Sequence, residues 1–360
     1  MTEKEKPETI PKAVILSGGR GVRLQPLTHS LPKPMVPVLN QPFLAHTLAY
    51  LKTHDIDNIT LTLSYLPKAV QSFFEDGSDY GVKITYAFED SPLGTAGAVK
   101  NAEHYLNSTI VVLNGDIFSD LDISEMLAFH RSRKAKATIS LTWVDNPCAF
   151  GVVETDSEGR VKRFIEKPTP DKVTTNWINA GIYILEPEIL KIVPAGEYYM
   201  FEKDLFPLLL ALDEPIYGYP FNGYWLDVGN PEKYLQLNCD LLLSKVKSHL
   251  TGDLGDTFVY KAVACSIHPS AEIVWPVVIG SNCSIGREVQ ITGPVVIGSD
   301  CLIGEGAALD SAVLWNGVTV GAGARLKRCI SGSYALIGAN DQVVDCTIVG
   351  DHIRSERVKF

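Results

Sequence analysis

The sequence predicts an α/β protein in two parts, an open and mostly parallel sheet with helices on both faces and then a stack of short parallel strands. Through about the first 240 residues, strand-like runs alternate with helical patterns, which is typical of a doubly wound sheet. From residue 262 the apolar pattern repeats every six residues, which neither a helix nor a flat sheet produces. We therefore expect domains at 1–244 and 262–360, joined by a linker at 245–261.

The composition agrees with two globular domains. The chain has 360 residues, of which 46% are hydrophobic and 21% are charged. Its net charge of −10 argues against sequence-independent binding to nucleic acid, which needs a basic face. The charged start lacks the apolar core of a signal peptide, and no apolar run approaches the roughly 18 residues that span a bilayer. We expect a cytoplasmic protein that does not enter a membrane.

The seven cysteines support the same expectation. They are scattered along the chain and include no C-x-x-C pair. Such cysteines indicate reduced thiols rather than a disulfide framework.

A glycine-rich loop follows the first strand of the predicted sheet. The apolar run Ala13–Leu16 reads as a buried strand, and it leads into Gly18, Gly19 and Gly21. Glycines there allow the backbone N–H groups to approach a ligand closely and to form an anion-binding concavity. The spacing matches neither the dinucleotide fingerprint nor the P-loop, so the loop is a phosphate site of another kind.

Positive charge gathers just after these glycines. Arg20, Arg23 and Lys33 lie in a stretch that contains no Asp or Glu from residue 20 to residue 33. Clustered cations without acids beside a glycine loop favour the binding of phosphate groups.

The next elements alternate as the fold class requires. We expect helices at 43–54, 68–75 and 94–106, and strands at 58–64, 82–88 and 109–113. Ligands of such sheets bind beyond the carboxyl ends of the strands. The glycine loop lies at one such end, and Asn114-Gly115-Asp116 lies at another.

The chain between residues 136 and 185 reads as antiparallel strands. A turn at 156–159 separates two of them. Further on, the run Tyr224–Gly229 precedes a helix that begins near Pro231, a residue suited to a first helical turn.

The loop resembles the signature of the sugar-nucleotide pyrophosphorylases, nucleotidyltransferases that join a sugar 1-phosphate to a nucleoside triphosphate. SGGRGVRLQPLT (17–28) followed by PKPM (32–35) matches their motif G-G-x-G-[ST]-R-L-x-P-L-T, except that Val22 replaces the hydroxyl residue. Further family motifs follow in order, namely Gly115-Asp116, Phe150-Gly151-Val152, Glu166-Lys167-Pro168, Asn179–Tyr183 and the W-x-D-x-G pattern that contains Asp227. The resemblance implies a Rossmann-like nucleotidyltransferase domain.

The resemblance also implies roles for individual residues. The residues expected to bind the nucleotide are Leu16, Gly18, Gly19, Gly21, Arg23, Gly94 and Thr95. The sugar phosphate is expected to contact Gly151, Glu166, Lys167 and Asn179, with the phosphate held by Lys167. Asp116 and Asp227 are expected to ligate Mg²⁺, a hard cation that prefers oxygen ligands beside substrate phosphates. The catalytic set is then Arg23, Lys33, Asp116, Lys167 and Asp227.

The segment P-L-G-T-A-G (92–97) resembles the guanylyl-transferring branch of the family, which implies GTP and mannose 1-phosphate as substrates. Backbone carbonyls of this segment, or Glu89 just before it, can accept from the N1–H and the amino group of guanine. The alternatives are transfer of glucose 1-phosphate to UTP, dTTP or ATP, and an inactive regulatory subunit that binds sugar nucleotides. An inactive subunit is expected to lose a catalytic cation or carboxylate, and this chain retains all five.

The C-terminal period resembles the hexapeptide repeat of left-handed parallel β-helices. Aliphatic residues recur without a miss at Ile267, Ile273, Ile279, Ile285, Ile291, Ile297, Ile303 and Leu309, and after a phase slip the pattern resumes weakly. We expect this domain to assemble the chain into a homo-oligomer. Acyl transfer by such a domain needs a catalytic histidine, and His268 and His352 are the ones available there; each reads better as a surface residue.

Overall fold

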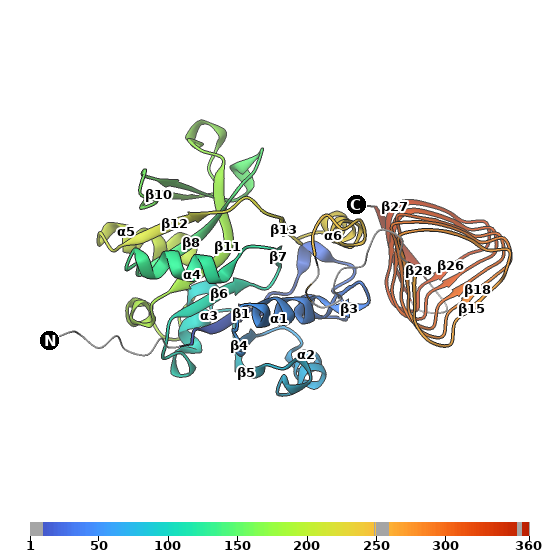
Figure 1. Cartoon of the computed structure of the whole chain (residues 1–360), viewed down its shortest axis with the longest axis horizontal. Coiled ribbons are helices and arrows are strands. Elements are labelled where there is room, and N and C mark those ends of the chain that lie inside the picture. Colours follow the sequence, from blue (N-terminus) through green and yellow to red (C-terminus); the bar gives the residue numbers. More distant parts are fainter. Residues whose placement is uncertain (1–9, 248, 250–258, 351–354, 360) are drawn as a thin grey trace. The chain divides into compact units, whose positions relative to one another are not determined.

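The computed structural model describes residues 10–247, 249, 259–350 and 355–359 (Figure 1). The chain divides into two compact units. The sheet unit comprises the N-terminal residues to Gly19 together with Thr47–Trp225, and the repeat unit comprises Arg20–His46 together with Leu226–Phe360. Most of the predicted linker at 245–261 lies outside the described residues.

The sheet unit is built on a nine-stranded sheet. Its main path runs in the order β10-β9-β11-β6-β1-β4-β5, and β8 and β12 extend it from β11. The bounds are β1 (Lys12–Leu16), β4 (Asn58–Leu63), β5 (Lys83–Phe88), β6 (Ile110–Asn114), β8 (Ala137–Trp143), β9 (Gly151–Thr155), β10 (Val161–Glu166), β11 (Trp177–Leu185) and β12 (Ile216–Pro220). A short strand, β7 (Ile117–Ser119), follows β6.

The sheet is mostly parallel in its first half and antiparallel beyond it. β1 pairs in parallel with β4 and β6, and β4 pairs in parallel with β5. β11 runs antiparallel to β6 and β8, and β9 runs antiparallel to β10. This arrangement confirms the predicted fold class and the predicted change to antiparallel strands after residue 136.

Helices alternate with the strands of this sheet along the chain. They are α1 (Phe43–Thr53), α2 (Pro67–Phe74), α3 (Gly94–Asn101), α4 (Ile123–Ser132) and α5 (Phe206–Ala211). Ala96 and Val99 of α3 and Phe206 of α5 are buried in a core that includes Val14 and Val112 of the sheet. α3 is shorter than the predicted 94–106, because its last turn gives way to the separate 3₁₀ turn Glu103–Tyr105.

The repeat unit contains a β-helix whose short strands stack in parallel, drawn in orange to red in Figure 1. Ile267, Ile285 and Ile303 lie one above another in three of its coils. Their side chains join one continuous aliphatic core. The predicted hexapeptide architecture is therefore confirmed.

The described strands of the β-helix belong to two sheets, and all their pairings are parallel except that of the last strand, which runs antiparallel to the strand before it. One sheet contains β14 (Val259–Lys261), β16 (Glu272–Val274), β17 (Val277–Ile279), β19 (Gln290–Thr292), β20 (Val295–Ile297), β22 (Ala308–Asp310), β23 (Val313–Leu314), β25 (Arg325–Ser331), β27 (Gln342–Gly350) and β28 (Ser355–Lys359). The other contains β15 (Ser266–Ile267), β18 (Ser284–Ile285), β21 (Leu302–Ile303), β24 (Thr319–Val320) and β26 (Leu336–Ile337).

The phase slip in the repeat has a simple structural origin. Ile303 stacks on Val320 and Val320 on Ile337, so each of these coils is one residue shorter than the coils before them. The stack of strands continues through the slip. The shorter spacing explains why the sequence pattern weakens while the architecture persists.

The repeat unit also includes an N-terminal part of the chain. We call residues 20–46 the cationic segment, because it carries Arg20, Arg23 and Lys33 and contains no acid. It holds two 3₁₀ turns (Val22–Leu24 and Lys33–Met35), the hairpin of β2 (Pro37–Val38) with β3 (Gln41–Pro42), and the first turn of α1. Helix α6 (Pro231–Leu242) belongs to the same unit.

Candidate active site

In the sheet unit, several of the predicted site residues lie at the carboxyl ends of neighbouring parallel strands. Leu16 ends β1 and pairs with Asn114, the last residue of β6. Gly115 follows and donates its N–H to the carbonyl of Leu16 (2.9 Å), and Asp116 occupies the turn before β7. The first strand, its glycine loop and Asp116 therefore meet at one edge of the sheet, as the topology of parallel strands requires.

Glu89 follows β5 and faces the same glycine loop. Its Oε2 accepts a hydrogen bond from the backbone N–H of Leu93 (3.1 Å). Its Oε1 lies only 2.8 Å from where a Cβ on Gly18 would be, so the carboxylate packs directly on the loop. Burial raises the pKa of Glu89 above its ordinary value, while the bond from Leu93 opposes that rise. This half-buried acceptor lies beside the predicted nucleotide site.

The segment 92–97 is fixed by the chain around residue 199. Gly94 begins α3, and the N–H of Gly97 donates to the carbonyl of Tyr199 (2.9 Å). In return, the N–H of Tyr199 donates to the carbonyl of Leu93 (2.8 Å). Gly94 and Thr95 thus occupy a helix start that a second segment holds in place.

The predicted sugar-phosphate residues lie on adjacent antiparallel strands. Gly151 pairs directly with Glu166, and Asn179 lies on β11. Burial, and after it the neighbouring Glu202, raise the pKa of Glu166, whereas Lys167 and Lys203 lower it. Lys167 has a left-handed backbone (φ 47°), and its ammonium lies 3.8 Å from the Glu166 carboxylate. Its side chain is largely exposed, so the charge is available to an anionic ligand.

A buried glutamate that the sequence analysis did not select connects these two groups of residues. Glu202 accepts from the hydroxyl of Thr95 (3.0 Å) and from the hydroxyl of Tyr183 (3.2 Å). Tyr183 in turn accepts from the side-chain amide of Asn179 (2.8 Å). The network runs from the predicted nucleotide segment to the predicted sugar pocket. No pattern marks Glu202 in the sequence, because it lies in a short irregular helix, Phe201–Leu205, with no signature of its own.

In the repeat unit, the cationic segment folds back on itself. Gly21 has φ 62° and precedes the turn Val22–Leu24, a left-handed conformation that glycine adopts without strain. The hydroxyl of Thr28 donates to the carbonyl of Gly21 (2.8 Å). A side chain on Gly21 would lie 3.3 Å from the Cβ of Lys33, so the two ends of the loop are close together. Val22 is 62% exposed, which explains why an aliphatic residue is tolerated there.

Arg23 and Asp227 meet in the same unit. A nitrogen of the Arg23 guanidinium lies 3.6 Å from the Asp227 carboxylate. Gly229 makes this approach feasible, because a Cβ there would lie 2.7 Å from the guanidinium. Any side chain at position 229 would therefore displace Arg23.

The structure thus distributes the predicted residues between its two units. The sheet unit brings together Leu16, Gly18, Gly19, Gly94, Thr95, Asp116, Gly151, Glu166, Lys167 and Asn179. The repeat unit brings together Gly21, Arg23, Lys33 and Asp227. Their roles in binding and catalysis stay predictions.

The histidines of the repeat, the cysteines, possible metal ligands and the helices were also subjects of prediction from the sequence. His268 makes a local contact with the hydroxyl of Ser270 (2.8 Å), and His352 lies outside the described residues. All seven cysteines are free thiols. Among the described residues, no group of three or more His, Cys, Asp or Glu side chains is arranged to hold a metal ion by itself. None of the described helices has both the length and the apolar character to cross a membrane.

Two family models match the chain. The nucleotidyl transferase model matches residues 12–244, and the model of the EIF2B subunit epsilon LbH domain matches residues 256–357. The two matches correspond to the parallel sheet and to the β-helix.

Known proteins are similar to most of the chain. The mannose-1-phosphate guanylyltransferase of Mycobacterium tuberculosis is 40% identical over 319 residues, which cover 88% of this chain and 83% of the relative. The UTP–glucose-1-phosphate uridylyltransferase of Synechocystis sp. is 35% identical over 342 residues, which cover 90% and 88%. The crystal structure of HddC from Yersinia pseudotuberculosis complexed with GMP-PN aligns with a TM-score of 0.55 at 31% identity, covering 63% of this chain and 98% of that one.

Proposed function

The chain belongs to the nucleotidyl transferase family and is an enzyme of that type, and we propose that its preferred substrates are GTP and mannose 1-phosphate. An oxygen of the sugar phosphate attacks the α-phosphorus of the triphosphate in line. The bond from that phosphorus to the bridging oxygen breaks, and pyrophosphate leaves with the electron pair. The products are GDP-mannose and pyrophosphate.

The observation that carries the choice of guanine is the position of Glu89. Its carboxylate lies against Gly18 and beside segment 92–97. Guanine presents two adjacent donors, N1–H and the amino group, which match the two oxygens of a carboxylate. The ring edge of uracil or thymine offers one N–H between two carbonyl oxygens, which a carboxylate repels. An unmatched buried polar group costs about 1–3 kcal/mol, so this contact discriminates between bases.

Both substrates are anionic, so the cationic side chains are proposed to bind and neutralise their phosphate groups. Arg23 and Lys33 are proposed to hold the triphosphate and the leaving pyrophosphate, and Lys167 to direct the sugar phosphate towards the α-phosphorus. The exposed ammonium of Lys167 and the acid-free surroundings of Arg23 and Lys33 in the sequence support these roles. Because neither substrate needs a covalent intermediate with the protein, positioning and charge neutralisation provide the rate enhancement.

Asp116 and Asp227 fit a divalent cation, which we propose to be Mg²⁺. Their carboxylates are hard oxygen donors at the end of β6 and in β13 (Trp225–Asp227). Mg²⁺ is commonly held by one or two protein carboxylates with substrate phosphates and waters, so a cluster of three or more protein ligands is not required. When bound, such a cation acts as a Lewis acid and a template for phosphates. Asp116 and Asp227 would each supply carboxylate oxygens to such a cation.

The second candidate is uridylyl transfer to glucose 1-phosphate, the activity named for the Synechocystis relative. Mannose and glucose differ only at the 2-hydroxyl, so the sugar is chosen by few contacts, including those of Glu166 and Asn179. We therefore expect firmer selection of the base than of the sugar. An inactive subunit is disfavoured because the five catalytic residues are all retained.

A substrate panel tests the assignment. Pyrophosphate release is measured with GTP, UTP, dTTP, ATP and CTP, each combined with mannose 1-phosphate and glucose 1-phosphate. GTP with mannose 1-phosphate should give the highest kcat/KM, with some activity on glucose 1-phosphate. A clear preference for UTP or dTTP with glucose 1-phosphate would exclude the proposed pair and leave the reaction class intact.

The same panel applied to Glu89→Gln tests the observation itself. This change replaces one acceptor oxygen by a donor, so kcat/KM for GTP should fall by about 10–100-fold, the range expected for one buried polar mismatch. Values for UTP should fall less. Asp90→Asn, a matched change at the exposed neighbouring residue, should leave the order of substrates unchanged.

We also propose a cytoplasmic location, which the seven free thiols support.

A further inference from the structure

Two buried side chains connect the β-helix to the backbone of the cationic segment. The indole N–H of Trp315 donates to the hydroxyl oxygen of Tyr234 (2.9 Å). The Tyr234 hydroxyl donates its own proton to the carbonyl oxygen of Pro37. Both rings are buried, Trp315 in a coil of the β-helix after β23 and Tyr234 on α6. Because an indole nitrogen only donates, the two hydrogen bonds have a fixed direction, from Trp315 to Tyr234 and from Tyr234 to Pro37.

The two hydrogen bonds persist at neutral pH, because the Tyr234 hydroxyl keeps its proton. Burial raises the pKa of Tyr234 well above its ordinary value, so the hydroxyl stays protonated. The carbonyl of Pro37 therefore always faces a donor.

Two more hydrogen bonds hold the turn that follows Pro37. The N–H of Leu39 donates to the side-chain oxygen of Asn238 on α6 (3.0 Å). The side-chain amide of Asn40 donates to the carbonyl of Ile297 in β20 of the β-helix (2.8 Å). Leu39 and Asn40 both have left-handed backbones, with φ 46° and φ 64°. Such a conformation is costly for leucine and persists only where its surroundings enforce it, which indicates that these contacts hold the turn.

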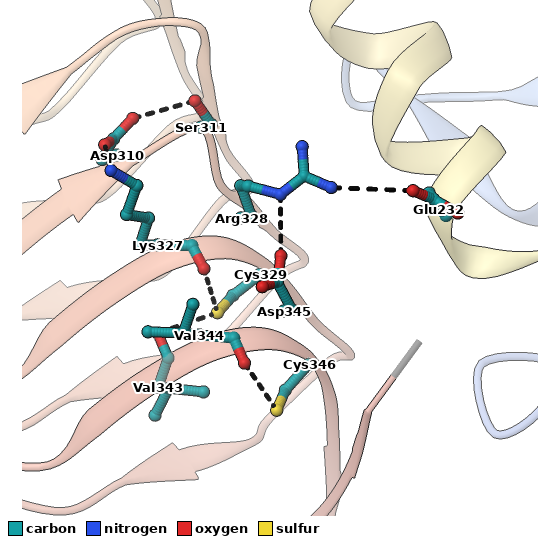
Figure 2. Close-up of polar contacts among 10 residues, drawn as sticks. All are labelled: Glu232, Asp310, Ser311, Lys327, Arg328, Cys329, Val343, Val344, Asp345 and Cys346. Atoms are coloured by element: carbon teal, nitrogen blue, oxygen red, sulfur yellow. Dashed lines mark hydrogen bonds and ion pairs between the residues drawn. The ribbon is translucent and has the colours of Figure 1, made fainter.

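Other contacts join the same partners more weakly. Figure 2 shows Arg328 of the β-helix between Asp345 in the next coil (2.7 Å) and Glu232 in the first turn of α6 (3.7 Å). These side chains are about half exposed, so the ion pairs add little stability. Buried Leu27 lies near Gly332 of the β-helix, 3.9 Å from where a Cβ on that glycine would be. The buried hydrogen bonds are therefore the stronger restraint.

The anchored points lie on both sides of Lys33. Leu27 precedes it and Pro37 follows it, and Thr28 ties the loop back to Gly21. We propose that Trp315 and Tyr234 are positioning residues, through which the β-helix holds the cationic segment in the conformation that presents Arg23 and Lys33 to the triphosphate. The second half of this inference rests on the proposed function. The first half, the restraint on the segment, does not.

The test uses the full-length chain in three variants, Trp315→Phe, Tyr234→Phe and the double variant. Hydrogen–deuterium exchange of the amides in 22–40 is measured without substrates, well below the unfolding temperature. Each single change should speed exchange in 22–40 by about fivefold, as expected for one lost hydrogen bond, and leave β6 and β11 unchanged. Both residues act through the same series of hydrogen bonds. The exchange rate of the double variant should therefore be about that of the more severe single variant.

Kinetics then separate positioning from general stability. The KM for the nucleoside triphosphate should rise by about three- to tenfold, while the KM for the sugar phosphate stays constant. Trp275→Phe is the matched control, because this tryptophan also lies in the β-helix but is 52% exposed, and it should behave as wild type. If Trp315→Phe fails to fold, Asn40→Asp tests the same restraint, since aspartate tolerates the left-handed turn but cannot donate to Ile297.

Two outcomes would overturn the proposal. Exchange in 22–40 that equals wild type in Trp315→Phe and Tyr234→Phe would exclude the restraint, whatever the substrates of the enzyme are. Faster exchange with an unchanged KM for the triphosphate would exclude the positioning role. Failure of the proposed function itself would instead appear as the absence of pyrophosphate release by the wild-type chain, and the exchange data would still decide on the restraint.

Discussion

At the scale of single residues, the proposed chemistry depends most on Asp116 and Asp227. We expect Asp116→Asn and Asp227→Asn each to lower Mg²⁺-dependent turnover by about 10²–10³, the usual cost of losing one strong electrostatic contact in a transition state. Asp116 lies in a turn and Asp227 in a three-residue strand, so the fold should persist. Pyrophosphate release measures turnover, and a thermal melt checks the fold.

Asp145→Asn is the matched control for these variants, because Asp145 is an exposed aspartate of the sheet unit outside the proposed site. It should keep wild-type activity. Near wild-type turnover in Asp116→Asn would remove this carboxylate from the mechanism.

A second prediction at this scale concerns pH and Glu166. Burial and the nearby Glu202 raise its folded-state pKa above the ordinary 4.5. The folded state therefore holds the proton more tightly than the unfolded state, and ionisation of Glu166 costs stability. This cost is absent below pH 4.5, grows as the pH rises through the folded-state pKa and is complete above it. Glu166→Gln should thus raise the Tm at pH 7 but not at pH 4.

The measurement is the difference in Tm between wild type and Glu166→Gln at several pH values. The same variant should raise the KM for the sugar phosphate, because Glu166 is proposed to bond the sugar hydroxyls. Glu154→Gln on the neighbouring strand β9 is a suitable comparison, since it lies outside the proposed pocket. A Tm difference that does not depend on pH would contradict the assigned cause of the shift.

At the scale of elements, the sequence predicted those whose pattern is local. Strands β4 and β6 lie within a residue of their predicted bounds, because β4 alternates apolar with polar residues and β6 is an apolar run. Helix α4 was not predicted, although Asp122 caps it by accepting from the N–H of Glu125 (2.9 Å). The link from Thr95 through Glu202 to Asn179 was also missed, because it joins segments about 80 to 110 residues apart. Only the folded chain places these side chains together.

One prediction at this scale concerns the start of α3. The hydroxyl of Thr95 accepts from the N–H of Phe201 (2.8 Å) and donates to Glu202. Thr95→Val keeps the shape and removes both bonds, leaving a buried N–H and a buried carboxylate oxygen without this partner. We expect a loss of about 1–3 kcal/mol of stability per unmatched group and weaker binding of the triphosphate. Urea unfolding measures the first and titration calorimetry with GTP measures the second.

Thr292→Val is the control, because Thr292 is an exposed threonine in the β-helix strand β19. It should change neither quantity by more than about 0.5 kcal/mol, as is usual for surface positions. A stable Thr95→Val variant with wild-type affinity would show that this network supports neither the helix nor the nucleotide site.

At the scale of the whole molecule, the hexapeptide period predicted the β-helix. It did not predict which other segments of the chain the β-helix contacts. The cationic segment lies some 200 residues before the repeat, yet it belongs to the same compact unit. Sequence patterns describe each element separately. The bond from Asn40 to Ile297, which joins residues 257 positions apart, follows only from the tertiary fold.

The last prediction concerns assembly, which we propose to be a function of the β-helix. Its coils bury one aliphatic column, and His268 contacts Ser270 beside it in the sequence, so the described residues of the β-helix give no indication of a catalytic pocket. Truncation near Lys245 should therefore change the oligomeric state, which light scattering gives as the number of chains per particle. The truncated chain also loses the contacts of Trp315 and Ile297, so we expect lower stability and a raised KM for the triphosphate. The full-length variant Trp315→Phe separates the two effects, because it should weaken the cationic segment while keeping the assembly of the wild type. If the truncated chain keeps the number of chains per particle of the full-length protein and still shows a cooperative thermal melt, the β-helix is not the element of oligomerisation.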